Sequence, residues 1–312
     1  MIISAGERTD IPTFYSEWFL NRLKAGFVLV RNPMFPNKIT KYSLDPTVVD
    51  CLVLCSKNPA PMVDKIKAIQ DMGHMLYFFV TITPYGKDIE PHVPPYEEVI
   101  ATFKQLSKLL GPNNVCWRYD PILVNETYTV DYHKEVFEAM AIELGPYTNR
   151  CIVSFVYLYQ KLRKNFPELT LVSELDSREL LTYFSSIASR EQFSLQVCAD
   201  RRDYTELGME NSGCFQARHL ELALGQPIKA LPEKPLRDGC HCIPRYDIGA
   251  YESCPHGCRY CYAVNDATQA LANYKQHDPL SSLLLGQVLP TDEIKEAQQK
   301  SYKLPFSQES LF

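Results

Sequence analysis

Short apolar runs rich in β-branched residues recur along the chain up to about residue 198. They span residues 1–4, 27–30, 51–54, 76–82, 115–119, 151–156 and 194–198. Most of these runs read as nearly continuous apolar stretches and not as a regular alternation of apolar and polar residues. Strands buried on both faces of a parallel sheet have this pattern, so we expect the runs to form such a sheet.

Stretches with helical periodicity separate these runs, at residues 13–23, 61–72, 96–110, 132–144 and 177–189. Several end in a glycine-containing stop, at Gly26, Gly73, Gly111 and Gly145. Asp131 and Ser177 stand where helix N-caps are expected. The repeated strand–helix order predicts an α/β fold with a (β/α) TIM-like barrel, complete or partial, followed by a C-terminal cysteine-rich iron–sulfur loop.

The regular alternation stops near Pro232. We therefore expect residues 1–231 to form the barrel core. Residues 232–312 are expected to contribute a cysteine-rich cluster-binding segment, a helix at 265–274 and a tail, all packed on the barrel. A chain of 312 residues is long enough for two domains, or for one large barrel with an appendage.

Charge and composition exclude some classes of partner. Hydrophobic residues make up 46% and charged residues 22%, as in ordinary globular proteins. The net charge of −5 gives no overall attraction to nucleic acid or anionic lipid. No apolar run approaches the ~18–20 residues that cross a bilayer, and the N-terminal sequence lacks the features of a signal peptide. We expect a cytoplasmic protein that does not use a membrane.

Six of the eleven cysteines lie between Cys214 and Cys261, and in a reducing compartment such clustering indicates metal ligands. Three of them, Cys254, Cys258 and Cys261, have the spacing Cys-x3-Cys-x2-Cys. Three thiolates so spaced can bind three irons of a 4Fe–4S cluster and leave the fourth iron open. Zinc, with His256 inside the loop, is an alternative, and free thiols are another.

This spacing, with an aromatic residue before the last cysteine, resembles the signature of radical S-adenosylmethionine enzymes. The resemblance implies that S-adenosylmethionine binds the open iron, that Tyr260 lies near the adenine, and that flavodoxin or ferredoxin supplies electrons. That superfamily carries the loop after its first barrel strand, near the N-terminus. A permuted barrel accounts for the late position here, with residues 247–250 leading into the loop and 265–274 forming the first helix.

The chain as a whole resembles a bacterial family of about this length, domain of unknown function family DUF1848. The stretches that carry the resemblance are residues 2–5, 8–12, 30–33, 57–59, 118–121 and 247–249. The family has no assigned reaction, so the resemblance implies no substrate.

Four further cysteines form a possible second site for zinc or another cluster: Cys198, Cys214, Cys240 and Cys242. The alternative is that Cys198 and Cys214 are small buried residues, the commonest fate of a cysteine that binds nothing. The remaining four cysteines lie in or beside apolar runs and are expected in the core: Cys51, Cys55, Cys116 and Cys151.

Polar residues follow the predicted strands at their C-terminal ends, where barrel enzymes carry their chemistry. The five that we expect to converge in one cavity facing the cluster, as the substrate site, are Arg8, Asp10, Lys57, Arg118 and Asp120. Others in equivalent positions are Arg31, Asn32, Asn58, Thr81, Thr83, Asp200 and Arg201. Paired Arg and Asp side chains orient carboxylates or phosphates, although salt bridging within the scaffold is the alternative.

The chain ends in Gln-Glu-Ser-Leu-Phe, from Gln308 to Phe312. This ending resembles the short peptide with which bacterial repair proteins dock on the sliding clamp, and it would favour a nucleic-acid substrate. The alternative is a frayed terminus, and no basic stripe with interleaved aromatics accompanies it.

Three functions fit these observations. The first is a radical S-adenosylmethionine enzyme that acts on an unknown substrate at the barrel rim. The second is an iron–sulfur redox protein that does not cleave the cofactor. The third is a DNA- or clamp-associated protein with a structural metal site. Formation of 5′-deoxyadenosine after anaerobic reconstitution separates the first from the others.

Overall fold

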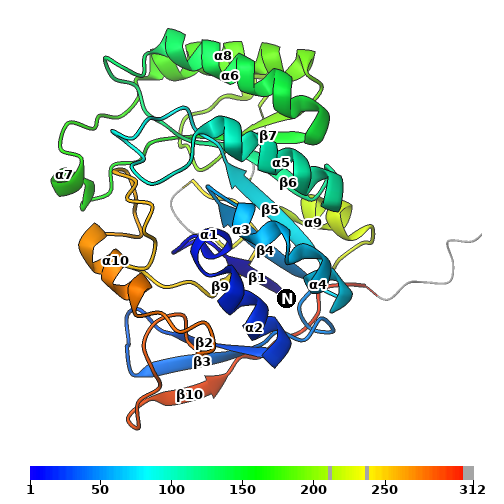
Figure 1. Ribbon diagram of the computed structural model, residues 1–312. Coiled ribbons are helices and arrows are strands. Elements are labelled where there is room, and N and C mark those ends of the chain that lie inside the picture. The colour runs from blue at the N-terminus through cyan, green and yellow to red at the C-terminus, as the bar shows by residue number, and fades with distance from the viewer. Residues whose placement is uncertain (210–212, 236–238, 305–312) are drawn as a thin grey trace, which may run out of the picture.

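The computed structural model of the protein describes residues 1–209, 213–235 and 239–304. Seven strands form the main sheet in the order β8-β7-β6-β5-β4-β1-β9, and every neighbouring pair is parallel (Figure 1). The strands are β1 Ile2–Ala5, β4 Cys51–Ser56, β5 Leu76–Thr81, β6 Val115–Ile122, β7 Arg150–Phe155, β8 Ser194–Val197 and β9 Tyr246–Asp247. The predicted α/β class with a buried parallel sheet is confirmed.

Helices connect most of these strands, as the alternation in the sequence predicted. The α-helices are α1 Ile11–Phe14, α2 Ser16–Ala25, α3 Ala60–Val63, α4 Ile66–Asp71, α5 Tyr96–Leu110, α6 Val130–Leu144, α7 Leu162–Asn165, α8 Glu174–Arg190, α9 Ala217–Leu224 and α10 Ala267–Lys275. Two short 3-10 helices are η1 Gly145–Tyr147 and η2 Thr205–Leu207. No helix among the described residues is both long and apolar enough to cross a membrane.

The main sheet is open and does not close into a barrel. Its edge strands β8 and β9 do not pair with each other in the described part of the chain. They are also short, with four and two residues. Starting from β9, the spatial order is β9-β1-β4-β5-β6-β7-β8, which never reverses direction. The predicted TIM-like barrel is therefore not confirmed.

A second, three-stranded sheet lies below the main one in Figure 1, in the order β10-β3-β2. Its strands are β2 Phe27–Arg31, β3 Lys38–Ser43 and β10 Glu293–Glu296. The prediction that residues 27–30 join the buried parallel sheet was wrong, because β2 pairs antiparallel with β3. The polar residues that alternate along β3 gave no continuous apolar run, so this partner strand was not predicted.

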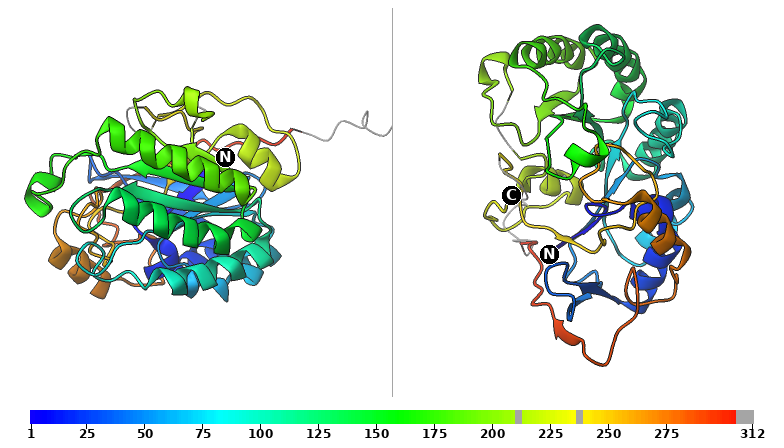
Figure 2. Two further views of the ribbon diagram at one scale, coloured as in Figure 1. Left: turned by 90° about the horizontal axis from the view of Figure 1, so that it is seen from above. Right: turned by 90° about the vertical axis from the view of Figure 1, so that its left-hand side faces the viewer.

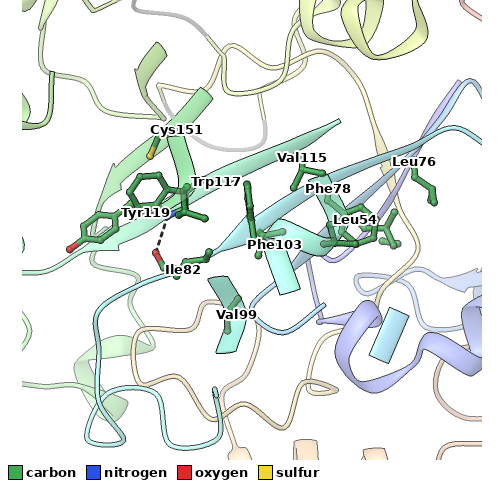
Figure 3. Close-up of a cluster of buried hydrophobic side chains, with 14 of the residues drawn as sticks. Leu54, Leu76, Phe78, Ile82, Val99, Phe103, Val115, Trp117, Tyr119 and Cys151 are labelled. Carbon is green, nitrogen blue, oxygen red and sulfur yellow. Dashed lines mark hydrogen bonds between the residues drawn. The ribbon is translucent and has the colours of Figure 1, made fainter. Parts of the chain in front are cut away.

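The two faces of the main sheet have different coverings. On one face Leu54, Phe78 and Trp117 pack with Phe103 of α5 in a large apolar cluster (Figure 3). The indole N–H of Trp117 donates to the carbonyl of Ile82 at 3.3 Å within this cluster. The helices α2, α5, α6 and α8 all contribute to it.

On the opposite face Val53, Phe79 and Cys116 pack against Phe215 and Leu220, which follow β8 in sequence. The left view of Figure 2 shows α9 and α2 on opposite sides of the strands. The segment between β8 and β9 thus covers the face that the connecting helices leave open.

The C-terminal segment is interwoven with the first residues of the chain. The strand β9 pairs with β1, and β10 pairs with β3. The hydroxyl of Tyr15 donates to the carbonyl of Ser253 at 2.5 Å, and the indole of Trp18 donates to the carbonyl of Ser281 at 2.9 Å. The expected boundary at residue 231 stays a prediction. The possible clamp-binding peptide from Gln308 to Phe312 lies outside the described residues.

Candidate functional site

The strand β9 leads directly into residues 251–263, which we call the cysteine loop. Its residues Tyr246 and Asp247 pair with Ile3 and Ser4 of β1. Since the carboxyl ends of parallel strands meet at one edge of a sheet, this pairing brings the cysteine loop to the edge where β1, β4 and β6 end. The predicted rim residues follow those same strands.

Glu252 closes the cysteine loop at its base. Its backbone N–H donates to the carbonyl of Ala263 at 3.1 Å, and its carboxylate accepts the backbone N–H groups of Asn265 at 2.7 Å and Asp266 at 3.1 Å. Its φ of 53° lies in the left-handed region, which few residues other than glycine adopt. Strain of this kind gathers at functional sites.

The three cysteines of the loop line one cavity of about 540 Å³. Each is only partly exposed, and burial raises the pKa of all three thiols. Cys258 is close enough to Cys254 and to Cys261 for their charges to interact. The three thiols thus face a shared space, as ligands of one cluster must.

His256 lies within the loop, but both of its ring nitrogens contact residues outside the loop. Its Nε2 is 2.9 Å from Oδ2 of Asp10, and its Nδ1 is 3.4 Å from the carbonyl of His92. Only 2% of the residue is exposed. In this arrangement His256 does not present a nitrogen to the three thiols, as the zinc alternative required.

The carboxylate of Asp10 is fully engaged. It also accepts the backbone N–H groups of Thr13 at 3.0 Å and Lys57 at 2.8 Å, and so caps α1. Burial raises the pKa of Asp10, but the hydrogen bond and charge of His256 outweigh it and leave the pKa below its usual value. Asp10 therefore positions His256 and the chain around it.

All five predicted rim residues line the cavity that the cysteines line. The three cations among these five residues are each held in an ion pair. Nε of Arg8 is 2.6 Å from Asp247, Nζ of Lys57 is 2.8 Å from Glu90, and Arg118 contacts Asp120. The structure therefore brings all five predicted residues together in one cavity.

The other polar residues at strand ends divide into two groups. Thr81 lines the cavity, and Thr83 accepts a hydrogen bond from Nζ of Lys57 at 3.1 Å. Arg31 follows β2, so it lies in the small sheet and pairs with Asp292 at 2.6 Å. The residues of this set that do not line the cavity are Arg31, Asn32, Asn58, Thr83, Asp200 and Arg201.

Tyr260, the expected adenine contact, lines the cavity beside Lys57 and Glu90. Its hydroxyl donates to Glu90, and Nζ of Lys57 lies 5.6 Å from the centre of its ring. Glu90 is 2% exposed and also accepts the hydroxyl of Thr83 at 2.7 Å. Sequence reasoning missed Glu90 because it lies in the connection between β5 and α5, away from any strand end.

Two further charged residues were also missed. Arg245 precedes β9 and pairs with Glu7, which follows β1. Both line the cavity. The hydroxyl of Tyr262 donates to the carbonyl of Glu7, which joins the cysteine loop to the end of β1.

Four more cysteines line the same cavity, and we call them the buried cysteine group: Cys198, Cys214, Cys240 and Cys242. The Sγ atoms of Cys214 and Cys242 are 3.3 Å apart. No disulfide joins any of the eleven cysteines, all of which the structure describes. These four cysteines therefore lie in one cavity, and the second metal site stays a prediction.

As the side chains stand, the described residues contain no group of three or more His, Cys, Asp or Glu that could hold a metal ion. A 4Fe–4S cluster does not need thiolates that converge on one point, because each binds a different iron atom.

Comparison with known proteins gives a family but no activity. No curated protein and no solved structure matches the chain. The family described as domain of unknown function DUF1848 matches residues 2–263, a range that contains the whole cysteine loop and every rim residue. The chain belongs to the DUF1848 family.

Proposed function

We propose that the protein is a radical S-adenosylmethionine enzyme whose 4Fe–4S cluster is bound by Cys254, Cys258 and Cys261. One observation carries the proposal: these thiols share a cavity with paired charged groups, and the only histidine of their loop is held elsewhere by Asp10. The loop therefore offers three ligands to a cluster with four irons, which leaves one iron for a small molecule.

The fit of the residues to this cofactor rests on the loop itself. Its thiols line one cavity and lie close enough together for their charges to interact. Glu252 fixes both ends of the loop by hydrogen bonds. When bound and reduced, the cluster supplies one electron that breaks a carbon–sulfur bond of S-adenosylmethionine, giving methionine and a 5′-deoxyadenosyl radical.

The order of the strands supports the same proposal. If β9 is counted as the first strand, the cysteine loop follows it, α10 comes next, and the remaining strands are added one after another across the sheet. This is the order expected of an incomplete, permuted (β/α) barrel, in which the cluster loop follows the first strand. We propose that the open sheet is such a barrel.

The cavity suits a charged small molecule that also carries a ring. Its volume of about 540 Å³ lies within the ~300–1,000 Å³ of ordinary ligand pockets. Aromatic side chains available to an adenine or a substrate ring are Phe155, Tyr157, Tyr159, Tyr251, Tyr260 and Tyr262. The guanidinium groups of Arg8 and Arg118 provide donors for a carboxylate, and their carboxylate partners provide acceptors for an amine.

The test begins with protein purified under anaerobic conditions and reconstituted with iron and sulfide. We expect dithionite-reduced protein to convert S-adenosylmethionine to 5′-deoxyadenosine slowly without substrate, and the triple variant C254A/C258A/C261A to form none. Cys151→Ala, which changes a buried cysteine of the helix-covered face, is the matched control and should keep the activity.

Two results would overturn this function. A wild-type iron–sulfur protein that never cleaves the cofactor would be an electron-transfer protein. A colourless protein whose metal is zinc at the cysteine loop would have a structural site.

A further inference from the structure

We propose that the buried cysteine group binds a second metal centre through four thiolates, and that Arg118 and Arg245 balance its negative charge. This inference does not depend on the reaction at the cysteine loop. It rests on the way the backbone gathers the four cysteines, on the contacts between their sulfurs, and on arginine N–H groups that have no acceptor.

Glycines permit the close backbone approaches that bring the cysteines together. A Cβ atom on Gly213 would lie 2.2 Å from the carbonyl oxygen of His241, so only glycine allows the residue before Cys214 to lie against the loop that carries Cys242. Gly239, next to Cys240, has a φ of 74°, and its Cβ would lie 3.4 Å from the backbone of Ala199.

The third segment is bent at its cysteine as well. Ala199, which follows Cys198, has a φ of 50°, an unusual conformation for a residue with a side chain. The backbone N–H of Cys198 donates to the carbonyl of Val153 at 2.8 Å, which anchors the cysteine to the end of the sheet. Three segments are therefore held in demanding conformations at the point where their cysteines meet.

The four sulfurs form a row of contacts. Cys214 contacts Cys242 at 3.3 Å and also Cys198, and Cys242 contacts Cys240. All four residues are at most 6% exposed. Binding requires the side chains to turn from this row towards a common centre and the thiols to lose their protons.

The arginines distinguish a metal site from ordinary core packing. The side chain of Arg245 is 5% exposed, and its Nη1 finds no hydrogen-bond acceptor among the described residues. Nε of Arg118 is also buried and finds no hydrogen-bond acceptor among the described residues. Arg245 lies close enough to Cys214 and Cys242 for their charges to interact. Arg118 lies close enough to Cys214 and Cys198 for the same interaction.

Four neutral thiols would offer Nη1 of Arg245 and Nε of Arg118 only weak acceptors. Four thiolates around a zinc ion or a 2+ iron–sulfur core leave a net charge of about −2. Glu7 and Asp120 already pair with the arginines through other nitrogen atoms. We therefore assign the two N–H groups without an acceptor as hydrogen-bond donors to the thiolate sulfurs of an anionic metal centre.

The first test uses the full-length triple variant C254A/C258A/C261A, in which the buried cysteine group is the remaining one of the two proposed metal sites. After anaerobic reconstitution with iron and sulfide, or with zinc alone, we expect the variant to retain either about four irons or one zinc per chain. The metal content identifies which of the two centres forms. Adding C214A and C242A should remove it, whereas adding C151A should not.

The outcomes are separable from those of the proposed function. A triple variant that folds by circular dichroism but retains neither metal overturns the second centre. Retained metal together with wild-type protein that makes no 5′-deoxyadenosine supports the second centre and overturns the radical enzyme.

A second measurement tests the arginine without removing a cysteine. In the triple-variant background, Arg245→Gln combined with Glu7→Gln removes the cation while leaving no unpaired carboxylate. Because outer-shell groups tune metal affinity about 10–100-fold, we expect a loss of that size in competition with a chelator. Glu7→Gln alone keeps the guanidinium and should keep the affinity. Equal affinities for the two variants would contradict the assignment.

Discussion

Lys57 and Glu90 show how the cavity holds buried charge. The carboxylate of Glu90 is 2% exposed on its side chain, and it accepts Nζ of Lys57 at 2.8 Å and the hydroxyls of Thr83 and Tyr260. Burial lowers the pKa of Lys57, but the charge of Glu90 outweighs it and raises the pKa above its usual value. Lys57 therefore carries its positive charge at neutral pH.

Replacing one member of this pair should cost far more than replacing both. Lys57→Met leaves a buried carboxylate without its cation, and we expect a loss of about 3–5 kcal/mol in the free energy of unfolding. The double variant K57M/E90Q should recover much of that loss. Urea unfolding of the three proteins measures both values, and an equal or larger loss in the double variant would contradict the pairing.

His133 gives the fold a dependence on pH. Its Nδ1 accepts from the hydroxyl of Tyr119 at 2.7 Å, its Nε2 donates to the carbonyl of Leu123 at 2.8 Å, and burial lowers its pKa from 6.5 to about 4. The unfolded chain binds a proton below pH 6.5 and the folded chain only near pH 4. Stability is therefore full above pH 6.5 and is lost as pH falls towards 4.

From the size of this shift, the wild-type protein should lose about 2 kcal/mol of unfolding free energy through His133 between pH 7 and pH 5. The variant His133→Gln cannot titrate and should lose about that much less over the same interval. Urea titrations at the two pH values give the difference, and parallel losses in both proteins would refute this role.

At the residue scale, sequence reasoning found the groups that follow strand ends, because the end of a strand is visible as the end of an apolar run. It did not find their partners. Glu90 is 33 residues from Lys57, and Glu7 is 238 residues from Arg245. No spacing in the sequence marks such pairs, which form only when the fold is complete.

Secondary-structure elements were predicted best where local signals agree. The helix α5 spans residues 96–110, as its apolar periodicity and Gly111 predicted. The starts of α6 and α8 were predicted too late. Thr129 and Ser173, not Asp131 and Ser177, accept the capping hydrogen bonds. Both caps stand before the first apolar residue of the helical pattern, so periodicity alone did not locate them.

The cap of α6 makes a direct test of this correction. The side chain of Thr129 accepts the backbone N–H of Tyr132 at 3.1 Å. We expect Thr129→Ala to cost about 1 kcal/mol of unfolding free energy, and Asp131→Ala to cost less because Asp131 is exposed in the first turn. Urea unfolding compares the two, and a larger loss for Asp131→Ala would restore the original assignment.

For the whole molecule, the sequence predicted an α/β protein with a parallel sheet but not the end of that sheet. The runs that form β1 and β4 to β8 were evident, whereas β9 has two residues and no apolar run. The packing of residues between β8 and β9 against Phe79 and Val53 is a long-range contact without a local pattern. The periodicity of the sequence therefore could not show whether the sheet closes into a barrel or stays open.

The interwoven C-terminal segment leads to a prediction about fragments. A chain of residues 1–231 lacks β9 and β10, which pair with β1 and β3, and it lacks the carbonyl of Ser281 that Trp18 binds. We expect this fragment not to unfold cooperatively on heating, in contrast to the full chain. A sharp thermal transition for the fragment, followed by circular dichroism, would instead support an independent domain ending at residue 231.

The ion pair between Arg8 and Asp247 can form only late in the synthesis of the chain. These residues are 239 positions apart in the chain. At synthesis rates of ~5–20 residues per second, the ribosome takes on the order of 10–50 s to make Asp247 after Arg8. Throughout that interval the outer edge of β1 has no partner, and a nascent chain with an open strand edge needs protection from other chains. Strands β1, β4 to β8 and β9 all precede Cys254 in the chain, so every described strand of the main sheet has been synthesised before the cysteine loop can bind a metal.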